Sequence, residues 1–80
     1  MKLNKILTKR EYQIIVTFLN YKRARLKIIE SYTNKLTLKQ IDEIINSLPE
    51  LNKHQVKQLY FWIEQKDVIF DRIRKKLESI

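Results

Sequence analysis

The sequence predicts an all-α fold, and three observations lead to this prediction. The 80-residue chain contains no glycine and a single proline, so it has few of the residues that interrupt helices or form tight hairpins. One six-residue pattern occurs three times, at residues 7–12, 36–41 and 51–56: apolar, Thr or Asn, two variable residues, Glu or Gln, apolar. Each copy is typical of a capping box with a hydrophobic staple, and apolar residues at helical spacing follow it.

The first pattern predicts a long helix over residues 9–33, preceded by a short basic arm at residues 1–7. Thr8 is the expected N-cap and Glu11 is its capping-box partner. A helix of this length spans about 37 Å and carries apolar side chains over roughly half of its circumference. We therefore expect more than one neighbour, along two apolar stripes: Tyr12, Ile15, Leu19, Leu26 and Ile29, and Ile14, Phe18, Tyr21, Ile28 and Tyr32.

The second pattern predicts a short helix over residues 38–48, with Thr37 as its N-cap. Pro49 ends this helix, because the residue before a proline is displaced from the helical region of backbone space. Residues 49–51 then form the turn to the third helix. The expected apolar face consists of Leu38, Ile41, Ile44, Ile45 and Leu48.

The third pattern, with Asn52 as N-cap, predicts one long helix over residues 53–79. Its apolar residues recur at spacings of three and four, with Lys66 in the one polar position: Val56, Leu59, Ile63, Phe70, Ile73 and Leu77. This seam has the heptad period of a coiled coil and favours a coiled-coil-like dimer helix. A second stripe contains His54, Phe61 and Val68. We expect it to be buried as well, with a dimer or partner surface as the alternative.

Composition excludes several classes of function. The chain has no cysteine and one histidine, which rules out disulfides, thiolate zinc sites and His-cluster metal sites. Without glycine it has no phosphate-binding loop or dinucleotide fingerprint. No nucleophile–base pair is visible, so we expect neither an enzyme nor a cofactor. No apolar run approaches the ~18–20 residues of a membrane span and no signal-peptide core is present, so we expect a cytoplasmic protein without membrane insertion.

Net charge gives the strongest indication of a partner. The 17 basic and 9 acidic residues leave a net charge of +8. A surplus of this size on so small a protein attracts polyanions, and we expect nucleic acid. Two segments concentrate the charge: residues 72–76, and residues 22–27 with Lys22, Arg23, Arg25 and Lys27. The alternative explanation is an AT-rich genome, whose codons favour Lys, Ile, Asn and Tyr.

The junction of the second and third helices resembles a known family. A short helix, a tight turn and a second helix, with starts about 15 residues apart, follow one another in LTLKQIDEIINSLPELNKHQVKQLYFWIEQKDVI, residues 36–69. This stretch resembles the helix-turn-helix half of winged-helix transcription regulators. The preceding LTKREYQIIVTFL, residues 7–19, is similar to the first helix of such domains. The sequence after Ile69 stays helical, so no wing is expected.

The resemblance implies that the third helix is a recognition helix whose first turns enter the major groove of DNA. Lys bonds the acceptors of guanine, Gln reads adenine, and a phenyl ring contacts the thymine methyl group. The basic residues at 22–27 would add phosphate contacts without sequence information. The side chains expected to face DNA are Lys53, His54, Lys57, Gln58 and Phe61.

We therefore expect a small regulator of transcription or copy number that binds duplex DNA as a homodimer. Its size and composition favour a plasmid, virus or other mobile element as its source. The alternative is a helical protein-binding module, such as an immunity protein or inhibitor, that uses an apolar helix face including Phe61. The exposed side of the first helix contributes to the expected dimer or partner interface, together with Trp62, Val68, Phe70, Ile73 and Leu77.

Overall fold

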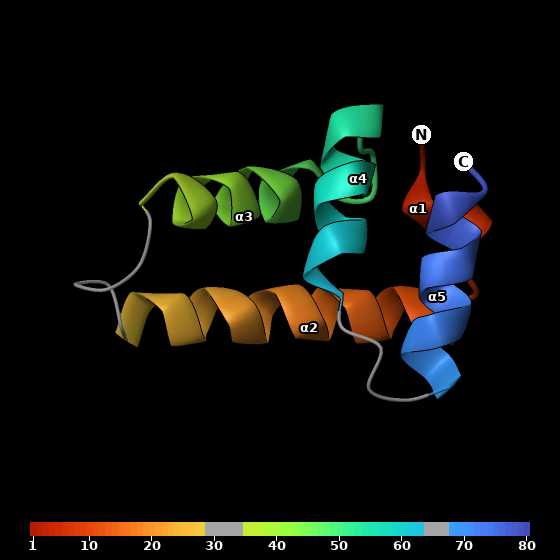
Figure 1. The fold of residues 1–80 in the computed structure, drawn as a ribbon, viewed down its shortest axis with the longest axis horizontal. Coiled ribbons are helices and arrows are strands. Elements are labelled where there is room, and N and C mark those ends of the chain that lie inside the picture. Colours follow the sequence, from red (N-terminus) through yellow and green to blue (C-terminus); the bar gives the residue numbers. More distant parts are fainter. Residues whose placement is uncertain (29–34, 64–67) are drawn as a thin grey trace.

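The described residues of the chain form five helices (Figure 1). They are seen in a computed structural model that describes residues 1–28, 35–63 and 68–80. Within these ranges the only β-type pairing is an isolated bridge between Lys2 and Glu50. The all-α prediction is confirmed. The helices are α1 (Leu3–Ile6), α2 (Lys9–Ile28), α3 (Lys35–Ser47), α4 (Lys53–Trp62) and α5 (Val68–Glu78).

Two pairs of helices build the molecule. α2 and α3 pack side by side and run in opposite directions (Figure 1). α4 runs crosswise to both of them, toward α2, and α5 packs against α4 and returns in the opposite direction. Both termini lie at the same end of the long axis of the molecule. The short helix α1 packs against α2 at that end.

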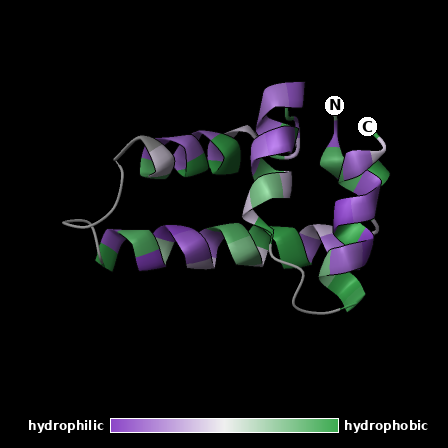
Figure 2. Ribbon diagram, in the orientation of Figure 1, coloured by the Kyte–Doolittle hydropathy of each residue, from purple (hydrophilic) through white to green (hydrophobic). Residues whose placement is uncertain are grey.

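The hydrophobic core lies where the two pairs meet. Figure 2 shows that the side of α3 facing α2 is hydrophobic and that its opposite side is hydrophilic, as expected for a helix with one buried stripe. All the helices contribute to the core or to the residues that flank it. The connected core residues are Leu3, Leu7, Ile15, Leu19, Ile44, Leu51, Val56, Leu59, Ile63, Ile73 and Leu77.

Residues 1–7 do not form the basic arm that the sequence predicted. Residues Leu3–Ile6 form α1, and both Leu3 and Leu7 are buried in the core. Their spacing of four residues brings the two side chains to one side of a helical turn. Lys2 and Lys5 remain exposed. The segment is therefore an apolar anchor with charged residues on its outer side.

Two of the three predicted helix starts are confirmed by their hydrogen bonds. At α2, the Thr8 N–H donates to Glu11 Oε1 over 2.8 Å and the Glu11 N–H donates to Thr8 Oγ1 over 3.2 Å. At α4, the Asn52 N–H donates to Gln55 Oε1 over 3.0 Å and the Gln55 N–H donates to Asn52 Oδ1 over 2.8 Å. Each capping box satisfies backbone donors that the helix itself leaves unpaired.

The predicted start of the second helix is wrong. α3 begins at Lys35, so Thr37 lies inside the helix instead of capping it. Residues 35–37 contain neither glycine nor proline, and nothing in that stretch stops the helix from extending upstream. The C-terminal end agrees with the prediction, because α3 ends at Ser47, shortly before Pro49. The predicted end of the first helix, at residue 33, lies outside the described residues.

The single helix predicted over residues 53–79 is wrong, because the structure has two helices there. α4 ends at Trp62, and Ile63 has extended backbone angles of φ −76° and ψ 116°. α5 begins at Val68 and packs against α4. The two halves of the apolar seam thereby join the core of one chain. So short a chain gains more buried surface from this arrangement than from one long helix with an unpartnered second half. Lys66 lies outside the described residues.

Candidate nucleic-acid interface

The junction between α3 and α4 is held by the N-terminal residues. The Leu3 N–H donates to the carbonyl of Pro49 over 2.9 Å, and the Leu51 N–H donates to the carbonyl of Met1 over 2.9 Å. The N-terminal ammonium of Met1 also pairs with the Glu50 carboxylate. These contacts fix the turn, and with it the start of α4. Sequence reasoning missed this role, although the helical spacing of apolar residues in the N-terminal segment was a usable signal.

The turn also carries an ionised carboxylate in a positive environment. The pKa of Glu50 lies below its ordinary value, first because the N-terminal ammonium donates a hydrogen bond to it. Desolvation opposes this change, and the charges of Met1, Lys2 and Lys5 add to it. The negative charge of Glu50 is therefore neutralised locally.

α4 separates a buried side from an exposed side. Val56, Leu59 and the following Ile63 are buried. The residues predicted to contact DNA lie on the opposite side, at helical spacings of three and four. All are exposed except the half-buried Gln58, and Phe61 is 77% exposed. The structure therefore brings together, on what we call the exposed side of α4, Lys53, His54, Lys57, Gln58 and Phe61.

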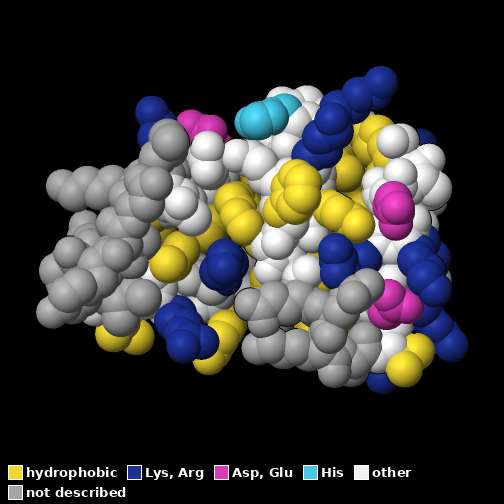
Figure 3. Space-filling model, viewed as in Figure 1, with side chains coloured by type: hydrophobic (Ala, Val, Ile, Leu, Met, Phe, Trp, Pro, Cys, Tyr) yellow, Lys and Arg dark blue, Asp and Glu magenta, His cyan; other side chains and the backbone are white. Residues whose placement is uncertain are grey.

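The N-terminal end of α4 projects from the body of the molecule. Its first turns extend past α3 in Figure 1 and are hydrophilic in Figure 2, whereas its last turns lie near α2 and are more hydrophobic. On the face shown in Figure 3, Lys and Arg side chains are dispersed among apolar ones and form no single continuous patch. The exposed side of α4 is thus defined by its position on one projecting helix and not by a broad basic surface.

A hollow of about 370 Å³ borders the exposed side of α4. One wall belongs to α4, and the other is formed by the C-terminal residues of the chain. The guanidinium of Arg74 lies 4.6 Å from the ring centroid of Tyr60, a cation–π contact that fixes the aromatic part of this wall. The basic side chains therefore have an apolar, aromatic border. The lining residues are Lys53, Val56, Lys57, Tyr60, Phe61, Leu77, Glu78 and Ile80.

The four basic residues predicted as a cluster on α2 do not form one surface. Successive helical residues point about 100° apart, so Lys22 and Arg25 lie on one side of α2 and Arg23 and Lys27 lie on another. Arg25 and Lys27 are exposed, whereas Lys22 and Arg23 are half-buried. The Arg23 guanidinium lies 3.5 Å from the Asp42 carboxylate of α3. Arg23 thus joins α2 to α3, a role that its place in a basic segment did not indicate.

The interface predicted along the apolar seam is wrong, because the seam belongs to the core. Ile73 is fully buried and Leu77 is only 3% exposed. Phe70 is half-buried, and its ring packs edge-on against Phe18 of α2 with the centroids 5.9 Å apart. The hairpin of α4 and α5 turns these side chains toward their own chain. Ile73 and Leu77 are therefore unavailable to a second chain.

The second apolar stripe is not buried, contrary to expectation. Phe61 and Val68 are 77% and 69% exposed, and His54 is exposed as well. Trp62, which was predicted as an interface residue beside them, is half-buried and packs against the core. Of Trp62, Val68, Phe70, Ile73 and Leu77, which were predicted for the interface, Val68 alone is exposed. The stripe faces solvent and leaves an apolar ring next to the basic residues of α4.

The basic segment at residues 72–76 forms ion pairs with carboxylates of α2 and of α5 itself. Lys76 Nζ lies 2.5 Å from Glu11 Oε1 at the start of α2, and Lys75 Nζ lies 3.3 Å from the Asp71 carboxylate one turn earlier. Burial raises the pKa of Glu11, but the hydrogen bonds from Lys76 and Thr8 outweigh it and leave the pKa below its ordinary value. Much of this positive charge is therefore used within the fold.

The described part of the chain contains neither a cluster of metal-binding side chains nor a membrane-spanning helix. In residues 1–28, 35–63 and 68–80, no group of three or more His, Cys, Asp or Glu side chains could hold a metal ion. None of the helices in these ranges combines the length and apolar character of a membrane span. No known protein family, characterised protein or solved structure matches the chain closely. Its function must therefore be argued from its own geometry.

Proposed function

We propose that this chain is a small DNA-binding protein, a regulator of transcription or copy number, that reads duplex DNA with α4. The proposal is carried by one observation. Two lysines, a histidine, a glutamine and a phenyl ring share the exposed side of α4, and the lysines and the histidine lie in its first turns, at the projecting N-terminal end. The net charge of +8 supplies the long-range attraction to a polyanion. α3 and the turn before α4 are the supporting half of a helix-turn-helix unit.

The dimensions of α4 suit the major groove. Its 10 residues span about 15 Å at 1.5 Å per residue. The major groove of B-DNA is about 12 Å wide and admits one helix. The N-terminal turn leads into the groove in this arrangement, and the positive end of the helix dipole favours phosphate there. No other surface described above combines a free helix end with so many exposed hydrogen-bonding side chains.

Some of the exposed side chains of α4 contribute affinity for DNA, and others recognise its bases. Lys53 and Lys57 lie one turn apart and reach phosphate oxygens or the acceptors of guanine. Gln58 matches the donor and acceptor pair of adenine, and His54 adds a hydrogen bond from the first turn. Phe61 contacts the methyl group of thymine, which accounts for an apolar ring placed among cations.

If the protein binds DNA as a dimer, the two chains must contact each other through a surface other than the predicted apolar seam, because the seam lies inside each chain. Each chain presents one reading helix. Two chains on a palindromic site would hold their α4 helices about 34 Å apart, one turn of B-DNA. A single chain supplies the complete set of contacts proposed here for one half-site.

Titration of a labelled duplex tests the proposal, with Lys57→Ala and Lys9→Ala measured beside the wild type. Lys9 is an exposed lysine on α2, so its loss removes the same charge from a surface that the proposal does not use. We expect Lys57→Ala to weaken binding about tenfold, within the ~1–3 kcal/mol of a base-contacting residue. Lys9→Ala should weaken it much less.

Salt dependence provides the second readout of the same titration. Wild-type affinity should fall with salt, log K decreasing by about 0.9 per phosphate contact for each unit of log salt. Lys57→Ala should reduce that slope if Lys57 contacts a phosphate. Absence of binding at low salt, or equal losses in Lys57→Ala and Lys9→Ala, would refute the proposal.

A protein-binding module that uses the same side of α4 makes a different prediction. Its anchor would be Phe61, which is 77% exposed, with Val68 nearby in sequence. Binding through an apolar anchor changes little with salt, whereas phosphate contacts are strongly screened. Phe61→Ser separates the two functions, because it removes the anchor of a protein partner, whereas DNA binding loses only the thymine-methyl contact and keeps its salt dependence through the lysines.

A further inference from the structure

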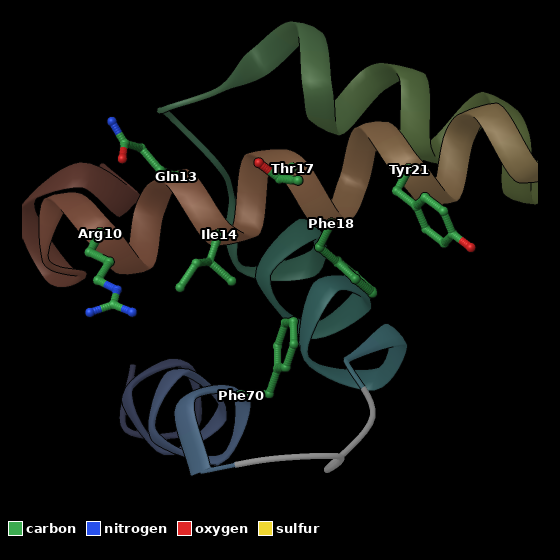
Figure 4. Close-up of a pocket in the computed structure, with 7 residues that line it drawn as sticks. All are labelled: Arg10, Gln13, Ile14, Thr17, Phe18, Tyr21 and Phe70. Atoms are coloured by element: carbon green, nitrogen blue, oxygen red, sulfur yellow. The ribbon is translucent and has the colours of Figure 1, made fainter.

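A second surface of the protein lies on α2 and shares no residue with the exposed side of α4. It contains a groove of about 520 Å³ along α2, bordered by the start of α5 (Figure 4). Six lining residues come from α2 and one comes from α5. They are Arg10, Gln13, Ile14, Thr17, Phe18, Tyr21 and Phe70.

The walls of this groove are largely apolar. In Figure 4, Ile14 and Phe18 project from α2 to the side on which Phe70 rises from α5. The rings of Phe18 and Phe70 meet edge to face at an interplanar angle of 62°, which ties the two walls together. Tyr21 stands at one end of the row and is 65% exposed. The groove is therefore built by packed side chains and remains open to solvent.

The apolar stripe continues along α2 beyond the groove. Arg25 and Ile28 follow Tyr21 by four and seven residues, so they lie on the same side of the helix. Arg25 is exposed and Ile28 is 84% exposed. From Arg10 to Ile28 this surface is about 27 Å long at 1.5 Å per residue. Tyr21 and Ile28 thus extend the apolar row of the groove, with Arg25 between them, and exposed apolar side chains that gather on one side of a helix mark an interaction site.

The charge along this surface has one sign. Arg10 stands at one end, opposite Tyr21, and Arg25 lies one turn beyond Tyr21. Among the described residues, no acidic side chain lines the groove. A matching partner must therefore combine apolar anchors with carboxylates near both ends, because Arg binds carboxylates with two parallel hydrogen bonds.

We propose that this surface, the α2 groove with its extension to Ile28, binds an acidic amphipathic helix of another protein. Apolar side chains of the partner at positions i, i+4 and i+7 fill the groove between Ile14, Phe18 and Phe70 and cover Tyr21. Carboxylates in its first and last turns pair with the two arginines. A helix of about 18 residues matches the 27 Å length of the surface.

Two other occupants match the surface less well. A second copy of this chain would bring its own arginines and another net charge of +8, and among the described residues no carboxylate lines the groove to neutralise them. A lipid bilayer is met by a protruding apolar face, whereas this surface is hollowed between α2 and Phe70. Charge and shape together favour the acidic helix.

Two labelled peptides of about 18 residues test the proposal against the full chain. Both carry leucine on one helical side, and they differ in having Glu or Lys at the flanking positions. We expect the Glu peptide to bind with a Kd on the order of 10 µM and the Lys peptide at least about tenfold more weakly. Arg25→Glu should weaken binding of the Glu peptide and strengthen binding of the Lys peptide. Loss of folding cannot produce such a reversal.

Tyr21→Ser tests the apolar part of the surface, with Phe61→Ser as its matched control, because each replaces an exposed aromatic ring. We expect Tyr21→Ser to lower the affinity for the Glu peptide by about fivefold or more, and Phe61→Ser to leave that affinity unchanged. The proposal is overturned if both peptides bind with equal affinity, or if the Glu peptide does not bind at concentrations up to about 1 mM. It is also overturned if Tyr21→Ser and Phe61→Ser lose affinity for the Glu peptide equally. The proposal is also overturned if the wild type self-associates, or binds anionic vesicles, and Tyr21→Ser abolishes that binding. The surface would then belong to a second copy of the chain or to a membrane.

Discussion

Replacing Glu11 with Ala should lower the free energy of unfolding by about 2 kcal/mol, because this side chain both accepts the capping-box hydrogen bond at the start of α2 and pairs with Lys76 of α5. Loss of the capping-box hydrogen bond from the Thr8 N–H to Glu11 Oε1 accounts for about 1 kcal/mol. The side chains of Lys76 and Glu11 are 39% and 9% exposed, so the ion pair lies between surface and interior and is partly screened. That position favours about 1 kcal/mol for the pair.

Glu11→Gln separates the two contributions. Glutamine keeps an oxygen that accepts the cap hydrogen bond but loses the charge, so it should cost about 1 kcal/mol. In a domain of this size that corresponds to a fall in Tm of about 4–8 °C, and roughly twice as much for Ala. Adding Lys76→Met to Glu11→Gln should cost less than the sum of the single changes, because the pair is already broken. Thermal denaturation in which Gln is as harmful as Ala, or in which the double variant is additive, would refute this reasoning.

The remaining predictions concern acid stability and the seam of α5. The pKa of Glu11 in the folded protein lies below the ordinary 4.5, so its contribution to stability is complete above that pH and is lost as the pH falls through the folded pKa. Between neutral pH and about pH 3, Glu11→Gln should therefore lose less stability than the wild type in denaturation experiments, and an equal loss would contradict the assignment. Ile73→Ala should cost about 2–4 kcal/mol of unfolding free energy at any protein concentration, because Ile73 is fully buried within one chain. Val68→Ser should cost less than about 0.5 kcal/mol, and a concentration-dependent effect of Ile73→Ala would show instead that the seam joins two chains.

The helix starts that the sequence encodes locally were predictable. At Thr8 and Asn52 the capping residue and its partner lie three residues apart, and no distant contact is needed for their hydrogen bonds. The exposed side of α4 follows from the same local logic. Once the helix start is known, its period decides which residues lie opposite the buried Val56 and Leu59.

The break after Trp62 was not predictable from local signals. Apolar spacings of three and four are the same for one long helix and for two shorter helices that share a core. The choice depends on whether α5 finds a partner within the chain, and Phe18, Tyr60 and Glu11 supply the contacts that hold it there. Thr37 shows the converse, because a complete capping pattern is overridden when the residues before it continue the helix.

For the candidate site residues, too, local features were predictable and contacts between distant residues were not. Arg23 looked available in the sequence because its partner, Asp42, lies on another helix. Two apolar stripes on the first helix correctly indicated more than one neighbour. However, the exposure of Tyr21 and Ile28 depends on where α5 stops covering α2, and no sequence pattern contains that information.

The central claim is that DNA meets the exposed side of α4, and amide chemical shifts of the labelled protein test it most directly. On titration with duplex DNA, the largest changes should fall on residues 53–61 and should shrink in Lys57→Ala. The α2 groove, from Arg10 to Tyr21, should change little. Changes concentrated on α2, or spread evenly over every exposed lysine, would contradict the claim and leave only non-specific attraction by the net charge.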